Sequence, residues 1–259
     1  MRIALVDSGL GSLAAAAALR RLRPDAALIL CADPDGMPWG PRTPQGITAR
    51  ALECAAPAAD ERPDALIVAC NTASVHALPA LRAMFEPAVP VVGTVPAVKP
   101  AAAAGGPFAV WATPATTGSG YQRRLIEEFA AGATATEVPC HGLAEAVERA
   151  DEAAVRAAVK AAAELTPPDT AAVVLGCTHY ELVAEPIRAQ LTSVTGAPVT
   201  LFGSAEAVAA QALRRVGAAP APGAPATGDL TVFASGRGAE LPEAALAYRE
   251  GRFLAGAAA

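Results

Sequence analysis

Two cysteines of this sequence stand where a thiol could exchange a proton with a substrate. Cys70 lies in VACNTAS (68–74) and Cys177 in VLGCTHYEL (174–182). Each follows a short aliphatic run and precedes a predicted helix. The thiolate is the reactive form of cysteine, and backbone N–H groups at the start of a helix favour it. We therefore expect both thiols to act as acid/base groups.

Short polar side chains accompany both thiols. Asn71 and Thr72 follow Cys70, where they could hydrogen-bond a bound anion or cap the next helix. Thr178 and His179 follow Cys177, and an imidazole beside a thiol can assist proton transfer. These residue types favour acid/base chemistry on a small polar substrate.

A third motif, VDSGLGSL (6–13), places Asp7 and Ser8 after a predicted strand and before a glycine-containing turn. It lacks the spacing of a dinucleotide-binding loop and of a Walker loop. We expect Asp7 to contact an ammonium group, while Ser8 and the turn amides hold a carboxylate.

Aliphatic runs alternate with Ala-rich helical stretches along the chain, which predicts an α/β fold with parallel strands covered by helices. The segment 216–228 is rich in Pro, Gly and Ala and is expected to be a loop. Strands are predicted near 2–6, 26–31, 65–69, 108–112, 171–175 and 198–202, and helices near 11–22, 44–58, 119–131, 151–165, 181–193 and 204–215.

The spacing of the polar motifs indicates an internal duplication. Cys70 follows Asp7 by 63 residues, and Cys177 follows Thr113 by 64 residues, each at the end of a predicted strand. Ligands of open α/β sheets bind at the carboxyl ends of the strands. Two such domains facing each other would present the thiols to opposite sides of one cleft.

Taken together, DSGLGSL (7–13), PWG (38–40), CNTA (70–73) and GCTHYEL (176–182) resemble the glutamate racemase family of the aspartate/glutamate racemase superfamily. The resemblance continues to the end of the chain. It implies two pseudo-symmetric, doubly wound α/β domains, 1–93 plus 203–259 and 94–202, with the active site in the cleft between them. It further implies interconversion of L- and D-glutamate without a cofactor, supplying D-glutamate for peptidoglycan.

The resemblance also implies roles for individual residues. Cys70 corresponds to the thiol that acts on the D-enantiomer and Cys177 to the thiol that acts on the L-enantiomer. Asp7, His179 and Glu148 correspond to groups that assist the thiols. The expected substrate-binding residues are Asp7, Ser8, Asp33, Pro38, Trp39, Gly40, Asn71, Thr72, Thr113, Thr116, Thr178 and His179.

Several residues depart from the family pattern. Trp39 replaces the usual Tyr, Ser12 replaces a Gly, and Glu181 replaces a Pro. Gly203 stands where Asp is common, and Gly36 stands where Arg is common. These departures leave the two thiols in place but open the choice of substrate, so a racemase for aspartate or another small amino acid is an alternative.

Racemisation explains why two thiols are needed. The α-proton must leave one face of the carbon and return to the other, and a single base reaches both faces poorly. Two rival interpretations remain open. One is a metal site formed by Cys70, Cys177 and His179, whose types suit zinc; the other is a non-catalytic amino-acid-binding protein on the same fold.

The composition limits the classes of binding partner that we expect for this protein. The formal net charge is −5 and no basic cluster is present, so nucleic acid is not expected as a partner. No apolar run is long enough to span a membrane, and we expect a cytoplasmic protein. Cys31 and Cys54 are expected to be buried without a role, and no disulfide framework is expected. A homodimer is an open expectation, because members of the family often form dimers.

Overall fold

The computed structural model describes residues 1–130 and 132–256, which form two compact α/β units. One unit comprises Met1–Val95 and the chain from Ala205 onward, and the other comprises Pro96–Ser204. The last residue of the expected helix 119–131, and residues 257–259 of the expected first domain, lie outside the described residues.

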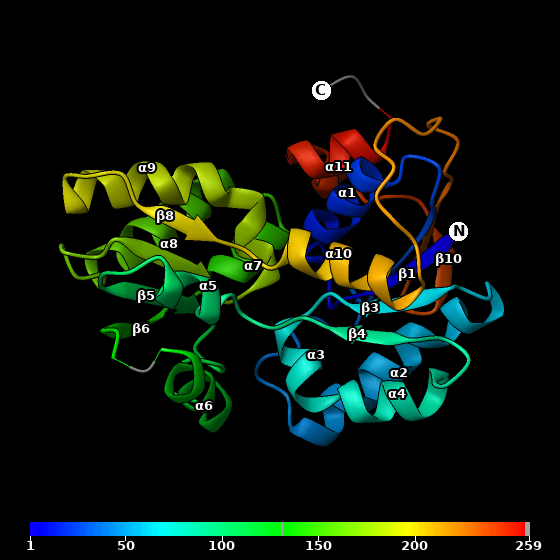
Figure 1. Cartoon of the computed structure of the whole chain (residues 1–259), viewed down its shortest axis with the longest axis horizontal. Coiled ribbons are helices and arrows are strands. Elements are labelled where there is room, and N and C mark those ends of the chain that lie inside the picture. Colours follow the sequence, from blue (N-terminus) through cyan, green and yellow to red (C-terminus); the bar gives the residue numbers. More distant parts are fainter. Residues whose placement is uncertain (131, 257–259) are drawn as a thin grey trace. The chain divides into compact units, whose positions relative to one another are not determined.

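The first unit is built on a sheet with the strand order β10-β9-β2-β1-β3-β4, parallel except for β10. Helices α1, α10 and α11 cover one face of this sheet, and α2, α3 and α4 cover the other (Figure 1). The elements are β1 (Arg2–Val6), α1 (Ser12–Leu22), β2 (Ala27–Ala32), α2 (Pro44–Asp60), β3 (Ala65–Val68), α3 (Asn71–His76), α4 (Leu78–Phe85), β4 (Val91–Gly93), α10 (Ala205–Arg215), β9 (Leu230–Ala234), β10 (Arg237–Ala239), the 3-10 helix η2 (Glu243–Ala247) and α11 (Arg249–Leu254).

The second unit is built on a parallel sheet with the strand order β6-β5-β7-β8. Helices α5 and α6 pack together, as do α7, α8 and α9. The elements are α5 (Val98–Ala103), β5 (Phe108–Ala112), α6 (Gly120–Phe129), β6 (Ala135–Pro139), α7 (Leu143–Glu148), α8 (Glu152–Glu164), β7 (Ala172–Leu175), the 3-10 helix η1 (Thr178–Val183), α9 (Ala184–Thr195) and β8 (Thr200–Phe202).

The two sheets share one topology. The order β2-β1-β3-β4 of the first unit matches β6-β5-β7-β8 of the second, so β3 and β7 are equivalent strands. Ala69 donates its N–H to the carbonyl of Val6 at 2.8 Å, and Gly176 donates its N–H to the carbonyl of Trp111 at 2.7 Å. The strand ends before Cys70 and Cys177 are therefore held by equivalent backbone hydrogen bonds.

Burial of the central strands on both faces explains why their sequences are continuously aliphatic. The side chains of Ile3, Leu5, Leu66 and Val174 have no exposed surface. A parallel sheet covered by helices on both faces requires apolar residues at every position. The predicted α/β class is confirmed.

The expected strands and long helices are present with boundaries shifted by a few residues, and the segment 216–228 is a loop. The predicted elements do not include β4, β6, β9, β10 and several short helices. β4 is only three residues long, and β6 has the sequence ATEVP, whose polar residues suit an edge strand but do not stand out as one. β9 follows the Pro/Gly-rich loop 216–228, and its five residues are too few to stand out from that loop in the sequence.

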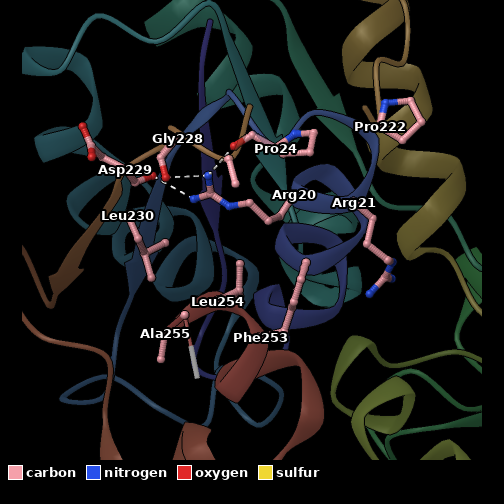
Figure 2. Close-up of a pocket in the computed structure, with 12 residues that line it drawn as sticks. Arg20, Arg21, Pro24, Pro222, Gly228, Asp229, Leu230, Phe253, Leu254 and Ala255 are labelled. Carbon is pink, nitrogen blue, oxygen red and sulfur yellow. Dashed lines mark hydrogen bonds between the residues drawn. The ribbon is translucent and has the colours of Figure 1, made fainter. Parts of the chain in front are cut away.

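Arg20, near the end of α1, ties the loop before β9 to the rest of the first unit (Figure 2). Its guanidinium donates to the carbonyls of Pro24, Ala26, Gly228 and Asp229 at 2.6–3.2 Å. A neighbouring cavity has a volume of about 820 Å³. The strand-end motif residues do not line it; its lining residues are Arg20, Arg21, Pro24, Pro222, Ala226, Gly228, Asp229, Leu230, Phe253, Leu254, Ala255 and Gly256.

We predict that Arg20→Ala lowers the free energy of unfolding by about 2–3 kcal/mol, because four carbonyls lose a charged donor. Arg21→Ala is the matched control. Arg21 is exposed on the same helix, and its loss should cost less than about 0.5 kcal/mol. Urea denaturation of both variants gives the comparison. Equal effects of the two substitutions would contradict a special role for Arg20.

Candidate active site

Cys70 and Cys177 adopt nearly the same backbone conformation. Their φ and ψ angles are −139° and 123° for Cys70, and −137° and 133° for Cys177. Each is the N-cap residue of the helix that follows, α3 or η1. Cys70 is 6% exposed, and Cys177 is half-buried. Each thiol thus lies at the junction between a strand end and the start of the next helix.

Gly176 is required by the approach of two strands. A Cβ atom at this position would lie 2.8 Å from the carbonyl oxygen of Trp111 and 3.2 Å from the Cβ of Ala112. The hydrogen bond from the Gly176 N–H to Trp111 needs this short separation. The glycine of the GCTH motif therefore allows β7 to end beside β5 and to place Cys177 there.

Asn71 is a buried polar residue whose side chain has no hydrogen-bond partner in the described part of the chain. It is 6% exposed, and among the described residues neither its Nδ2 nor its Oδ1 has a hydrogen-bond partner. It does not cap α3, which begins at Asn71 itself. A buried amide without a partner is costly, so its donor and acceptor are suited to a bound polar molecule.

A chain of acid/base groups extends from Cys177 to Glu148 within the second unit. Nδ1 of His179 lies 3.8 Å from the Cys177 sulfur, and Nε2 of His179 lies 3.1 Å from Oε2 of Glu148. His179 is 3% exposed. The Glu148 carboxylate, at the end of α7, fixes the orientation of the imidazole beside the thiol. Sequence spacing alone did not connect Glu148 with His179.

Asp7 lies at the end of β1 in the first unit and is fully buried. Its Oδ2 accepts the N–H of Gly9 at 3.1 Å, and its own N–H donates to the carbonyl of Cys31. Because β1 and β3 are adjacent parallel strands, Asp7 and Cys70 follow neighbouring strand ends. Ser8 is also buried.

Asp33 is the centre of a hydrogen-bond network in the first unit. Its carboxylate is 1% exposed and accepts from Trp39 Nε1 at 2.8 Å, from Ser235 Oγ at 2.8 Å and from two nitrogens of Arg50. Burial raises the pKa of Asp33, but these hydrogen bonds and the charge of Arg50 outweigh burial and bring the pKa below its ordinary value. The Asp33 carboxylate is thus held by three neighbouring side chains, and its contact with a substrate stays a prediction.

Gly36 makes room for this network. A Cβ atom at Gly36 would collide with the Asp33 carboxylate and with Nε of Arg50. The space beside Gly36 is taken by the guanidinium of Arg50, which α2 contributes to the network. Sequence reasoning missed Arg50 and Ser235, because they lie 17 and 202 residues from Asp33.

The remaining expected site residues are placed as follows. Trp39 is 1% exposed and packs in the hydrophobic cluster that includes Cys70, while Pro38 is exposed and Gly40 half-buried. Thr113 and Thr116 follow β5 with their hydroxyls 3.2 Å apart. Their contact with a substrate stays a prediction, as does that of Thr72, which is half-buried, and of Thr178, which is 5% exposed.

The other three cysteines differ from the motif cysteines. Cys31, Cys54 and Cys140 are at most 2% exposed. Burial raises the pKa of the Cys31 thiol to about 12, and it raises the pKa of Cys54 and of Cys140 well above the ordinary range. All five cysteines are free thiols. The three buried thiols are therefore unreactive, as was expected for Cys31 and Cys54.

The described residues also bear on metal binding and on membrane insertion. Across residues 1–130 and 132–256, His, Cys, Asp and Glu side chains nowhere gather in a group of three that could hold a metal ion. Within the same residues, each helix is too short or too polar to cross a membrane.

Comparison with known proteins agrees with the arrangement of these motifs. The sequence model of a family described as Asp/Glu/Hydantoin racemase matches residues 11–215. The chain belongs to this family. The glutamate racemase of Roseiflexus sp. (strain RS-1) is 38% identical over 214 residues, which cover 80% of this chain and 76% of that protein. The glutamate racemase of Pectobacterium atrosepticum is 39% identical over 207 residues, 74% of this chain and 70% of that protein.

A solved structure extends the similarity to the fold. Escherichia coli glutamate racemase, crystallised with L-glutamate and the activator UDP-MurNAc-ala, superposes with a TM-score of 0.79 and 29% identity. The match covers 95% of this chain and 91% of that chain. The resemblance to glutamate racemases and the two-domain α/β fold are thereby confirmed. The protein is an amino-acid racemase, an enzyme of the isomerase class.

The Asp33 network predicts an acid-dependent contribution to stability. A carboxylate whose pKa is lower in the folded protein stabilises it above the pKa of the unfolded chain, about 3.9, and loses this effect as the pH falls through the lower, folded value. At neutral pH, Asp33→Asn should lower the free energy of unfolding by about 2–3 kcal/mol, because Arg50 loses its charged partner.

Urea denaturation of the wild type and Asp33→Asn between neutral pH and pH 2 tests this prediction. The two stabilities should converge as the pH falls below about 4. A difference that stays constant to the lowest pH would show that the ionisation of Asp33 does not stabilise the fold.

Proposed function

We propose that this chain interconverts L- and D-glutamate without a cofactor, with Cys70 and Cys177 as the two acid/base groups. The observation that carries the proposal is the equivalent placement of the two thiols. Cys70 follows β3 and Cys177 follows β7, which are the third strands of their units in sequence order. Both cysteines have nearly the same backbone conformation, and each is the N-cap of the next helix. No structural requirement explains a cysteine at both equivalent positions, whereas a two-base reaction does.

In the proposed reaction, the two thiols act on opposite faces of the α-carbon of the bound substrate. The Cys177 thiolate removes the α-proton of L-glutamate, so that the Cα–H bond breaks and an S–H bond forms. The Cys70 thiol then donates its proton to the opposite face of the carbanion. D-glutamate is formed and Cys70 is left as the thiolate. The reverse reaction exchanges the two roles.

The carbanion is the main energetic problem, because an amino-acid α-proton is very weakly acidic. Fixed donors in a water-poor pocket can stabilise the charge that develops on the substrate carboxylate. Asn71 suits this role, because its buried Nδ2 can donate to the carboxylate while its Oδ1 can accept from the ammonium group. Thr72, Thr178 and Ser8 provide further hydroxyl donors.

His179 and Glu148 would serve Cys177 as a proton-transfer pair. The imidazole nitrogen 3.8 Å from the sulfur is placed to exchange a proton with the thiol, and the Glu148 carboxylate holds the ring in that orientation. Asp7 would play a corresponding part on the Cys70 side, since it follows the strand next to β3. The two assisting groups differ chemically even though the thiols are equivalent.

Glutamate is favoured as substrate by the relatives, several of which are glutamate racemases at 34–39% identity. The product would supply the D-glutamate of peptidoglycan, and the enzyme would act in the cytoplasm. Trp39 and Ser12 keep aspartate as the alternative. The racemisation rates of L-glutamate and L-aspartate, measured side by side on the purified protein, decide between them.

We predict that Cys70→Ala and Cys177→Ala each reduce kcat by at least about 100-fold, because one face of the substrate loses its acid/base group. Thermal-shift titration with D-glutamate should still show binding. Cys31→Ala is the control, since Cys31 lies fully buried within β2, and it should keep kcat within about threefold of the wild type. Near-normal turnover in either of the first two variants would exclude the mechanism.

A further inference from the structure

Two departures from the family pattern, Glu181 and Gly203, are in direct contact. Glu181 lies in η1, the turn that begins with Thr178 after Cys177. A Cβ atom at Gly203 would collide with Oε2 of Glu181 and would lie 2.7 Å from its Cδ. The absence of a side chain at Gly203 is thus what lets the Glu181 carboxylate occupy this space.

The carboxylate makes specific hydrogen bonds there. Oε1 of Glu181 accepts from the backbone N–H of Ser204 at 2.8 Å and from the Ser204 hydroxyl at 2.9 Å. Ser204 is 3% exposed and is the last residue of the second unit before the chain enters α10. Glu181 therefore joins the turn after β7 to the end of the neighbouring strand β8.

We propose that Glu181 is a positioning residue for the Cys177–Thr178–His179 turn, and that Gly203 is the matching position that accommodates it. The assignment rests on the proposed function of Cys177. η1 is a short 3-10 helix, which by itself holds its shape weakly. Two hydrogen bonds from Ser204 to a charged acceptor fix the turn four residues beyond the thiol. Displacement of a catalytic group by about 1 Å can cost about 100-fold in rate.

The first test compares Glu181→Ala with Glu181→Gln. The alanine variant removes the acceptor and should lower kcat at least about tenfold, while KM changes by less than about threefold. The glutamine variant keeps an acceptor oxygen for Ser204 and should stay within about threefold of the wild type. Glu185→Ala is the matched control, because this neighbouring carboxylate is 84% exposed in its side chain, and its loss should leave kcat unchanged.

The second test places a carboxylate at position 203, first with and then without the carboxylate at position 181. Gly203→Asp alone places a second carboxylate against Glu181 and should lower kcat and the thermal midpoint. Combining Gly203→Asp with Glu181→Ala removes the collision and the like-charge repulsion. The kcat of the double variant should be no lower than that of Gly203→Asp alone, a non-additive result that is expected for residues in contact.

A measurement that does not depend on catalytic activity tests the positioning role of Glu181 separately from the proposed function. Iodoacetamide alkylation, followed by peptide mass spectrometry, gives the modification rates of Cys177 and Cys70 in each folded variant. Glu181→Ala should change the Cys177 rate at least about threefold and leave the Cys70 rate unchanged. If the wild type does not racemise glutamate but this shift occurs, the positioning role stands and the proposed function fails. An unchanged Cys177 rate, or an additive double variant, overturns the positioning role.

Discussion

The register between neighbouring parallel strands is the constraint on which the site depends. In each unit, the strand before the cysteine is hydrogen-bonded to the first strand of the sheet, through Ala69 to Val6 and through Gly176 to Trp111. A shift by one residue would turn each side chain to the other face of its sheet. The buried aliphatic residues on both sides prevent such a shift, and thereby fix the thiols at the carboxyl ends of the strands.

The same scaffold carries different chemistry at its two equivalent strand ends. In the second unit, Cys177 is followed by an imidazole that is held by Glu148. In the first unit, Cys70 is followed by Asn71, an amide without an internal partner among the described residues, and Asp7 ends the adjacent strand. The shared sheet topology thus places the two thiols equivalently, while the residues around them differ in chemistry. A reaction that treats two faces of one carbon needs two thiols but not identical surroundings.

Much of this arrangement could be predicted from the sequence, because it depends on local patterns. Continuous aliphatic runs identify the central strands, and Cys70 and Cys177 directly follow two of them. Contacts between distant segments could not be predicted. Asp33 was expected beside the substrate, yet its carboxylate is engaged by Trp39, Arg50 and Ser235. No periodicity links α2 and the β9–β10 turn to the end of β2, so only the folded chain reveals that network.

The departures from the family pattern gain a physical explanation from the same contacts. Gly36 and Gly203 both lack a side chain where a charged group from another element needs the space, Arg50 in one case and Glu181 in the other. In both places, a glycine leaves room for a charged side chain that comes from a distant part of the sequence.

The central claim is that two thiols act on opposite faces of one carbon. The most direct test follows the first turnovers of L-glutamate in D₂O by NMR and mass spectrometry, with the enantiomers separated. The account predicts that newly formed D-glutamate carries deuterium at Cα, donated by Cys70, while the unreacted L-glutamate keeps its protium. D-glutamate that retains the substrate's own α-proton would show that one base serves both faces, and would contradict the account.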